Sequence, residues 1–385
     1  MDKWKKVKIS DLGQVVGGAT PSTKKEEYYN GDIAWITPKD LSDFHGRYIS
    51  KGERSITKAG MDSCSTQLLP KNTILFSSRA PIGYVAIAKN EICTNQGFKS
   101  VIPNDNVDYL FLYYLLKYNK DIIEAMGSGT TFKEVSGSTM RNIEVMIPES
   151  TAIQRDIAAI LDSIDSKIEN NQKINDNLQQ QLHLLFVQIF DGFDMDVALG
   201  DVVGTTSGGT PSRKHDEYYD GGSICWVKSK ELLGGYIHDT EEHINDLAVT
   251  KSSAKLLPAH SVLIAMYGAT VGAYGIISRP MSCNQAVCAL LGNEKYPYTY
   301  LFQMACESQQ KLINLAVGSA QQNISQVLIK QLLFHSDIDT IQRFHLLAQP
   351  MHEEMELLQA ENRYLSELRD SLLPPLMSGK LDAPT

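Results

Sequence analysis

The sequence predicts an α+β protein in which one structural unit occurs twice: two similar mixed α/β domains joined by two long helices that pair antiparallel as a coiled coil, related by a pseudo-twofold internal duplication. Three observations lead to this prediction. The chain repeats itself over nearly its whole length, each globular part carries glycine-punctuated strand patterns, and each repeat ends in an apolar stripe with helical spacing.

The internal repeat is the strongest of these signals. The segment GGATPSTKKEEYYNGDIAW at 17–35 is matched by GGTPSRKHDEYYDGGSICW at 208–226, and the Thr-Pro-Ser triplets within them lie 190 residues apart. Leu-Leu-Pro, Asn-Gln, Gly-Ser and Ile-Gln-Arg motifs then recur in the same order at similar offsets. Because this period is far too long for a solenoid, it indicates a duplicated domain.

Strand and helix patterns occur at matching places in the two halves. β-branched residues around glycine predict hairpin-linked strands at 74–78 with 84–88, and at 262–266 with 274–278. Amphipathic helices are predicted at 109–126 and 300–316, each followed by a Gly-Ser turn.

Two further segments have a narrow apolar stripe typical of a coiled-coil seam. Its positions are Ile153, Ile157, Ile160, Ile164, Ile168, Leu178, Leu182, Leu185 and Ile189 in the first segment, and Ile341, Phe344, Ala348, Met351, Met355, Leu358, Leu365, Leu368 and Leu372 in the second. Asn171, Asn175 and Asn362 fall on the seam, where a paired asparagine fixes helix register; alternatively they face solvent. The helices pair with each other, or alternatively each packs on its own globular part.

These patterns divide the chain into five parts. The predicted boundaries are 1–150 for the first domain, 151–192 for a central helix, 193–337 for the second domain, 338–378 for a C-terminal helix and 379–385 for a tail.

Charge and cysteine content narrow the function. The net charge is −9, but residues 1–150 carry +2 and the two helical segments are acidic, so a local basic face remains compatible with DNA binding. Six cysteines without a CxxC pair argue against a zinc ribbon and against a thiol-redox site, and favour a reduced, cytoplasmic protein. The start of the sequence has no apolar signal segment, and we expect no membrane span.

A search for catalytic motifs finds none. The sequence has no [DNS]PP[YFW] methyltransferase tetrad, no phosphate-binding loop, no HExxH zinc motif and no GxSxG elbow. We therefore expect no catalysis. A stand-alone DNA methyltransferase or nuclease, or a coiled-coil adaptor without DNA contact, are the alternative functions.

The ordered motifs resemble those of a known family. Two units that each begin near a G-G-x-T-P-S type loop, continue through a tryptophan, an LLP strand segment and an Asn-Gln pair, and end in a long helix led by Ile-Gln-Arg resemble the specificity (S) subunit of a type I DNA restriction-modification system. The C-terminal LLPPLMSGKL adds to the resemblance, which covers essentially the whole chain.

The resemblance implies a division of labour among subunits. Each globular part is then a target recognition domain for one half of a bipartite, asymmetric double-stranded DNA sequence, and the helices set the gap between the halves. The helices also bind two adenine-methylating (M) subunits, which carry S-adenosylmethionine, and a translocating nuclease (R) subunit joins for restriction. This chain itself would hold no cofactor and no metal.

Features shared by the two halves are predicted to build the fold, and DNA contacts are expected where the halves differ. Trp35 and Trp226 are accordingly expected in the core. In the major groove, arginine forms hydrogen bonds with guanine and side-chain amides form them with adenine, whereas lysine mainly contacts phosphates. The candidate DNA-contacting residues are Lys39, Arg47, Lys51, Arg54, Lys58, Arg79, Thr130, Thr131 and Lys133 in the first half, and Lys228, Lys230, Lys251, Lys255, Tyr267, Gln321, Gln322 and Asn323 in the second.

Overall fold

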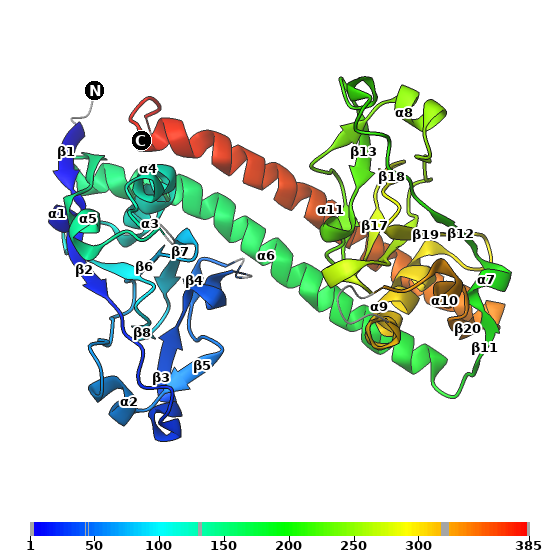
Figure 1. Cartoon of the computed structure of the whole chain (residues 1–385), viewed down its shortest axis with the longest axis horizontal. Helices are drawn as coiled ribbons and strands as arrows, with labels where there is room; N and C mark the ends of the chain where they lie inside the picture. The colour runs from blue at the N-terminus through cyan, green and yellow to red at the C-terminus, as the bar shows by residue number, and fades with distance from the viewer. Residues whose placement is uncertain (1–3, 43, 45, 130–132, 317–322, 383–385) are drawn as a thin grey trace. The chain divides into compact units, whose positions relative to one another are not determined.

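The structure is a computed structural model that describes residues 4–42, 44, 46–129, 133–316 and 323–382 (Figure 1). The chain forms two compact units. The first consists of the residues up to 169 and those from 364 onward, and the second consists of residues 170–363. Each unit therefore contains one globular part and a stretch of both long helices.

The elements of the first half run from blue through cyan to green in Figure 1, with the long helix α6 in green. They are β1 (Trp4–Lys8), α1 (Ile9–Leu12), β2 (Gly13–Gly17), the 3-10 helix η1 (Glu26–Tyr28), β3 (Tyr29–Ile36), η2 (Pro38–Leu41), β4 (Tyr48–Ile49), β5 (Arg54–Ile56), α2 (Lys58–Asp62), β6 (Ile74–Ser78), β7 (Ile82–Ala88), β8 (Cys93–Thr94), β9 (Lys99–Pro103), α3 (Tyr109–Tyr118), α4 (Lys120–Ala125), α5 (Gly137–Asn142), β10 (Glu144–Pro148) and the long helix α6 (Thr151–Phe190).

The second half repeats this series with two differences, the additional 3-10 helix η5 and the single helix α9 in place of α3 and α4. It contains β11 (Met195–Ala198), α7 (Leu199–Val202), β12 (Gly204–Ser207), η3 (Asp216–Tyr218), β13 (Ile224–Val227), η4 (Ser229–Glu231), β14 (Tyr236–Ile237), β15 (His243–Ile244), α8 (Asp246–Lys251), β16 (Val262–Ala265), η5 (Gly268–Thr270), β17 (Tyr274–Ile277), β18 (Ser282–Cys283), β19 (Val287–Leu291), α9 (Tyr298–Leu315), α10 (Gln326–Lys330), β20 (Leu333–His335) and the long helix α11 (Ile338–Met377).

The sheets of the two halves have the same topology. The first half has a five-stranded sheet in the order β2-β9-β6-β7-β4, a three-stranded sheet β5-β3-β8 and the pair β1-β10. The second half has β12-β19-β16-β17-β14, β15-β13-β18 and β11-β20. The predicted hairpins are the antiparallel pairs β6-β7 and β16-β17. The predicted duplication and fold class are thus confirmed.

The predicted helix 109–126 is wrong in one respect, because the chain breaks it at Asn119 into α3 and α4. Asn119 is buried, and its side-chain amide donates to the carbonyl of Leu115 at 2.8 Å. A local side-chain bond of this kind competes with regular helix. Helix α3 is also buried all round from Phe111 to Leu116, so it is a core helix and not an amphipathic one.

Each long helix buries its apolar stripe within each unit. In the first unit, Ile157 and Leu161 of α6 share one core with Leu373 and Leu376 of α11. In the second unit, Leu182 and Phe186 of α6 share a core with Phe344 and other residues from the start of α11. The beginning of α6 thus packs with the end of α11, and the end of α6 with the beginning of α11, which is the antiparallel pairing expected.

The same cores contain side chains of the globular parts. Phe111 and Tyr114 lie in the first core, and Tyr300 and Phe334 lie in the second. The two alternatives for the helices are therefore both realised, since each helix packs on its partner and on a domain. This double contact widens the buried stripe beyond the predicted seam, to include Leu161, Phe186 and Phe190.

The seam asparagines of α6 are buried. Asn171 has no exposed surface, and its amide donates to Glu361 Oε2 at 2.7 Å and to Asn362 Oδ1 at 2.9 Å across the helix pair. Asn175 is also buried and donates to the carbonyl of Asn171 at 3.2 Å. A bond between Asn171 and Asn362 forms in one axial alignment of the helices, which supports the hypothesis that these residues set register.

Helix α11 also buries a histidine against the second domain. His352 lies fully inside, with Nδ1 at 3.1 Å from the hydroxyl of Tyr236. Burial lowers the pKa of His352 from 6.5 to about 3, with a smaller contribution from the neighbouring His260 and His345. The folded second unit therefore requires the neutral imidazole.

This burial predicts a loss of stability in mild acid. Below pH 6.5 the unfolded chain takes up a proton at position 352 that the folded chain takes up only near pH 3, so stability is complete above pH 6.5 and falls as pH drops from 6.5 toward 3. Between pH 7 and pH 5 we expect this group to remove about 2 kcal/mol. Urea denaturation of the chain and of a His352→Gln variant at both pH values measures it. Equal pH dependence in the two proteins would contradict the prediction.

Candidate nucleic-acid interface

The repeated Thr-Pro-Ser loop is held by the same bonds in both units. Tyr29 donates its hydroxyl hydrogen to the carbonyl of Pro21 at 2.7 Å, and Tyr219 does the same to Pro211 at 2.7 Å. The indoles of Trp35 and Trp226 donate to carbonyls of the chain preceding each loop, at 3.1 and 3.0 Å. Both tryptophans are buried, as predicted, so this shared feature builds the fold.

The β6-β7 turn of the first unit brings two predicted segments together. Arg79 stands at this turn, and the chain that follows α4 returns beside it through a bond from Val135 N to Ser78 O at 3.0 Å. Glu134 then lies 3.6 Å from the Arg79 guanidinium and 3.2 Å from the Lys99 ammonium. We call Arg79, Lys99 and Glu134 the first hairpin cluster.

The first hairpin cluster has a chemistry suited to base recognition. The Arg79 side chain is 36% exposed, and its partner Glu134 holds it at a distance that leaves donors free to form other bonds. An oriented arginine at a turn matches the bidentate contact that guanine offers. Lys133 is exposed next to the cluster, whereas Thr130 and Thr131 lie outside the described residues.

The corresponding turn of the second unit carries different side chains on the same backbone frame. Ile324 N donates to Met266 O at 2.9 Å, and Tyr267 forms a β-bridge with Asn323. Tyr267 is 40% exposed. We call Tyr267 and Asn323 the second hairpin cluster. Gln321 and Gln322, which we also predicted as contacts, lie outside the described residues.

Most of the other candidates are exposed and many are paired with carboxylates. Lys39 lies 2.8 Å from Glu53, and Lys58 lies 3.6 Å from Asp62, while Lys51 is exposed. The Arg54 guanidinium covers the ring of Tyr29, 4.0 Å from its centre. Such surface pairs are weak, so a phosphate can displace the carboxylate.

In the second unit the predicted lysines form a similar set. Lys228 pairs with Glu242, and Lys230 lies 2.6 Å from Glu241. Lys255 donates to the hydroxyl of Thr206 at 2.8 Å, and Lys251 is exposed at the end of α8. Phosphate contact by these lysines stays a prediction, and their positions are compatible with it.

Arg47 corrects one prediction, because it faces the protein interior. Its guanidinium contacts both oxygens of Glu169, with Nε at 2.8 Å from Oε1 and Nη2 at 3.1 Å from Oε2, and also bonds to Asp162 and Ser166 of α6. Only 5% of the residue is exposed. Arg47 therefore joins the first domain to α6 and is withdrawn from the DNA-contact candidates.

The sequence did not point to Lys99 and Glu134. Lys99 lies at the start of strand β9 and Glu134 follows the Gly-Ser turn, 35 residues later. A single lysine and a single glutamate at that separation give no pattern, and the cluster forms only because β9 and the returning chain meet at one end of the sheet.

None of the helices in the described parts of the chain is long and apolar enough to span a bilayer.

Comparisons with known proteins agree with this architecture. A family model for the type I restriction modification DNA specificity domain matches residues 1–180 and 194–335. The chain is 34% identical over 406 residues to the type I restriction enzyme MjaIX specificity subunit of Methanocaldococcus jannaschii, across 98% of this chain and 93% of that protein. It is also 30% identical over 190 residues to the EcoR124I/EcoR124II specificity subunit of Escherichia coli, across 47% of this chain and 45% of that one.

A solved structure shares the fold over nearly the full length. The S subunit of a type I restriction-modification system from M. genitalium superimposes with a TM-score of 0.62 at 17% identity, covering 98% of this chain and 96% of that chain.

The burial of Arg47 predicts a specific loss of stability. Replacing Arg47 by methionine leaves Asp162 and Glu169 without their cation, and because these carboxylates are partly exposed we expect a loss of about 2–3 kcal/mol. Lys39→Met, which removes an exposed and solvent-screened pair, serves as the matched control and should leave stability nearly unchanged. Urea denaturation of the full chain measures both. Similar losses in the two variants would show that Arg47 does not join the domain to α6.

Proposed function

The chain belongs to the family of type I restriction-modification DNA specificity proteins, and from this premise we propose that each of its two domains recognises one half of a bipartite, asymmetric double-stranded DNA sequence. The observation that carries the proposal is the pair of hairpin clusters. Two domains with one sheet topology present Arg79, Lys99 and Glu134 in one case and Tyr267 with Asn323 in the other.

Different side chains on a common frame favour two different half-sites. Arginine donates two bonds to guanine, whereas an asparagine amide both donates to and accepts from adenine. A perfectly palindromic target is therefore not expected. The exposed lysines of each domain are assigned to phosphates, where they add affinity without base preference.

We further propose that the helix pair sets the unrecognised gap between the half-sites. A helix of 40 residues, the length of both α6 and α11, is about 60 Å long. Half-sites on one face of DNA lie about 34 Å apart, or a multiple of this distance. A paired helix is stiff over such lengths, whereas a flexible linker is not.

We assign catalysis to partner subunits and none to this chain. In this proposal two adenine-methylating subunits bind the helices and carry S-adenosylmethionine, a translocating nuclease subunit completes the restriction complex, and the assembly acts in the cytoplasm. The helices expose large apolar side chains that such partners would cover: Leu184 is 66% exposed, Leu346 71% and Leu357 66%. Because the helical segments carry a net negative charge, we propose that the partner subunits contribute to phosphate binding.

Exchange of the first domain tests the modular part of this proposal. The chain is purified with adenine-methylating subunits, and bound sequences are selected from a random duplex pool, before and after residues 1–150 are replaced by those of another family member. The donor domain should carry arginine at the position of Arg47, so that the contact with Asp162 and Glu169 is kept. We expect one half of the selected sequence to change and the other half to stay.

Two outcomes of the exchange would contradict the proposal. A change in both halves would show that the domains do not act separately. Failure of the unaltered complex to select any sequence would support an adaptor without DNA contact.

Single substitutions test the assignment of base and phosphate contacts. Arg79→Ala should relax the preference at one base pair of the first half-site by roughly tenfold or more, because one bidentate contact is lost. Tyr267→Ala should alter the second half-site alone. Lys58→Ala, the control, should weaken binding similarly for all sequences and lower its salt dependence. Competition binding with single-base variants of the target measures these effects. A uniform loss in Arg79→Ala would remove Arg79 from the base-contacting residues.

A further inference from the structure

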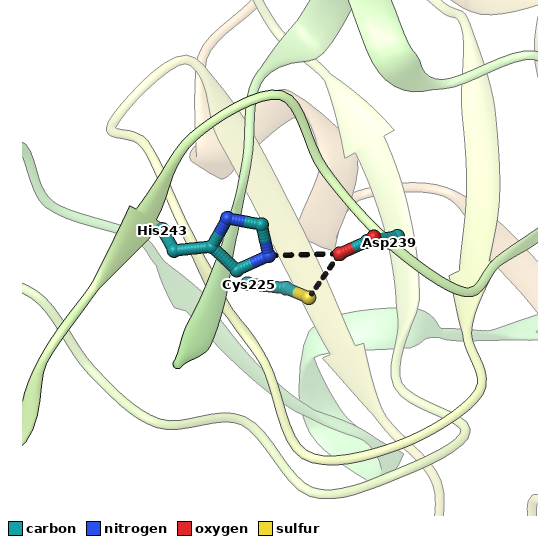
Figure 2. Close-up of side chains that lie close together, drawn as sticks. All are labelled: Cys225, Asp239 and His243. Carbon is teal, nitrogen blue, oxygen red and sulfur yellow. Dashed lines mark hydrogen bonds and ion pairs between the residues drawn. The ribbon is translucent and has the colours of Figure 1, made fainter. Parts of the chain in front are cut away.

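Three side chains capable of binding a metal converge in the second domain, at a place that the proposed function does not use. Figure 2 shows Cys225, Asp239 and His243 pointing toward one another. The Asp239 Oδ1 atom lies 2.8 Å from His243 Nε2 and 3.3 Å from Cys225 Sγ, and all three donor atoms lie within 4.8 Å of one another.

Local structure explains why these residues meet. Cys225 on β13 and His243 on β15 are directly opposed in an antiparallel pair. Asp239 lies in the connection between β14 and β15, four residues before His243. Cys225 is buried, whereas Asp239 and His243 are half-buried, so the group lies at the margin of the domain and is accessible from solvent.

The donor set and its dimensions fit a divalent metal of the zinc type. Thiolate, imidazole and carboxylate are the ligands that Zn²⁺ selects, and a tetrahedral ion with its usual bond lengths holds its donor atoms about 3.3–3.6 Å apart. The carboxylate–imidazole separation of 2.8 Å must lengthen by about 0.5 Å, and the sulfur–nitrogen separation, at most 4.8 Å, must shorten by about 1.3 Å or less to reach this geometry. A water molecule would complete the fourth position.

Two arginines act on this group of side chains. Arg363 orients the carboxylate of Asp239, and Arg279 competes with a metal ion for the sulfur of Cys225. Arg363 of α11 holds the second oxygen of Asp239, with Nη2 at 3.0 Å from Oδ2, which leaves Oδ1 directed at the cluster. Hydrogen bonds of this kind commonly orient metal-binding carboxylates. Arg279 lies 3.0 Å from the sulfur and 3.8 Å from Asp239 Oδ1, but its side chain is 53% exposed and can turn into solvent.

The duplicated fold provides an internal comparison. In the first domain the opposed pair on β3 and β5 that corresponds to Cys225 and His243 is Ala34 and Ser55. Lys51 stands two residues after β4, as Asp239 does after β14. The same sheet thus forms without these three ligands, so the fold alone does not require them.

We propose that Cys225, Asp239 and His243 form a binding site for one divalent transition metal, with Zn²⁺ as the best chemical match. When the ion binds, the cysteine gives up its proton to solvent and the thiolate coordinates the ion, while the imidazole of His243 coordinates in its neutral form with its one proton on Nδ1, so that the hydrogen bond from Nε2 to Asp239 is replaced by bonds to the ion. The ion would fix the connection between β14 and β15 to β13. This connection also carries Glu241 and Glu242, which hold Lys230 and Lys228.

Cobalt and zinc titrations of the metal-free full chain test the proposal. Co²⁺ should give visible d–d bands and a near-ultraviolet thiolate-to-metal band that saturate at one ion per chain. Zn²⁺ should displace it. At 100 times its dissociation constant, Zn²⁺ should raise the melting temperature by about 5 °C. The Cys225→Ala and His243→Ser variants, which copy the first domain, should fold and lose both effects, whereas Cys64→Ser is the control that keeps them.

The Arg279→Ala variant separates a metal site from a group of ion pairs. Removing a competing cation about 4 Å from the ion should strengthen metal binding roughly fivefold. If the cluster is an ion-pair network alone, the full chain shows no cobalt bands and no stabilisation by zinc. Either that result, or unchanged cobalt bands in Cys225→Ala, would overturn the proposal.

Discussion

Burial of the apolar stripes of α6 and α11 is the interaction on which the rest of the structure depends. A long helix with a narrow apolar stripe and an otherwise polar surface gains little stability alone. In each unit a stretch of one helix covers a stretch of the other, and a globular domain covers the remaining flank, as in the first unit, where Phe111 and Ile157 belong to one core. The helices therefore act as a common core element for both domains, and each domain helps to hold them together.

An arginine–carboxylate pair joins domain and helix in each unit, and the two pairs have opposite sign. In the first unit the domain contributes the cation, Arg47, and α6 contributes the carboxylates Asp162 and Glu169. In the second unit the domain contributes the carboxylate, Asp239, and α11 contributes the cation, Arg363. The domains share a fold, but at these contacts the surfaces that face the helices carry charges of opposite sign. Moving one domain to the place of the other would leave these charges without partners of opposite sign. Partly buried charges without partners are costly, and this cost favours each domain in its own position.

The sequence was sufficient for the architecture because duplication and apolar periodicity are visible in one dimension. It located the hairpins, the long helices and the seam asparagine Asn171, whose hydrogen bond to Asn362 follows from helix pairing. It did not distinguish Arg47 from the exposed basic residues around it, because burial of Arg47 depends on Asp162 and Glu169, more than a hundred residues later. The first hairpin cluster and the three metal-binding side chains are likewise products of strand pairing across unrelated loops.

Duplication also explains how the two halves diverge without losing the fold. The tryptophan and tyrosine bonds of the Thr-Pro-Ser loop recur in both halves, and they stabilise each domain independently of the residues at the hairpin turn. At that turn the backbone bond is kept, from Val135 to Ser78 and from Ile324 to Met266, while the adjacent side chain is Arg79 in one unit and Tyr267 in the other. Since a main-chain bond fixes the turn in both cases, the side chains there are free to vary. The proposed recognition of two different half-sites requires this separation between the residues that fold the domain and the residues that are proposed to contact the bases.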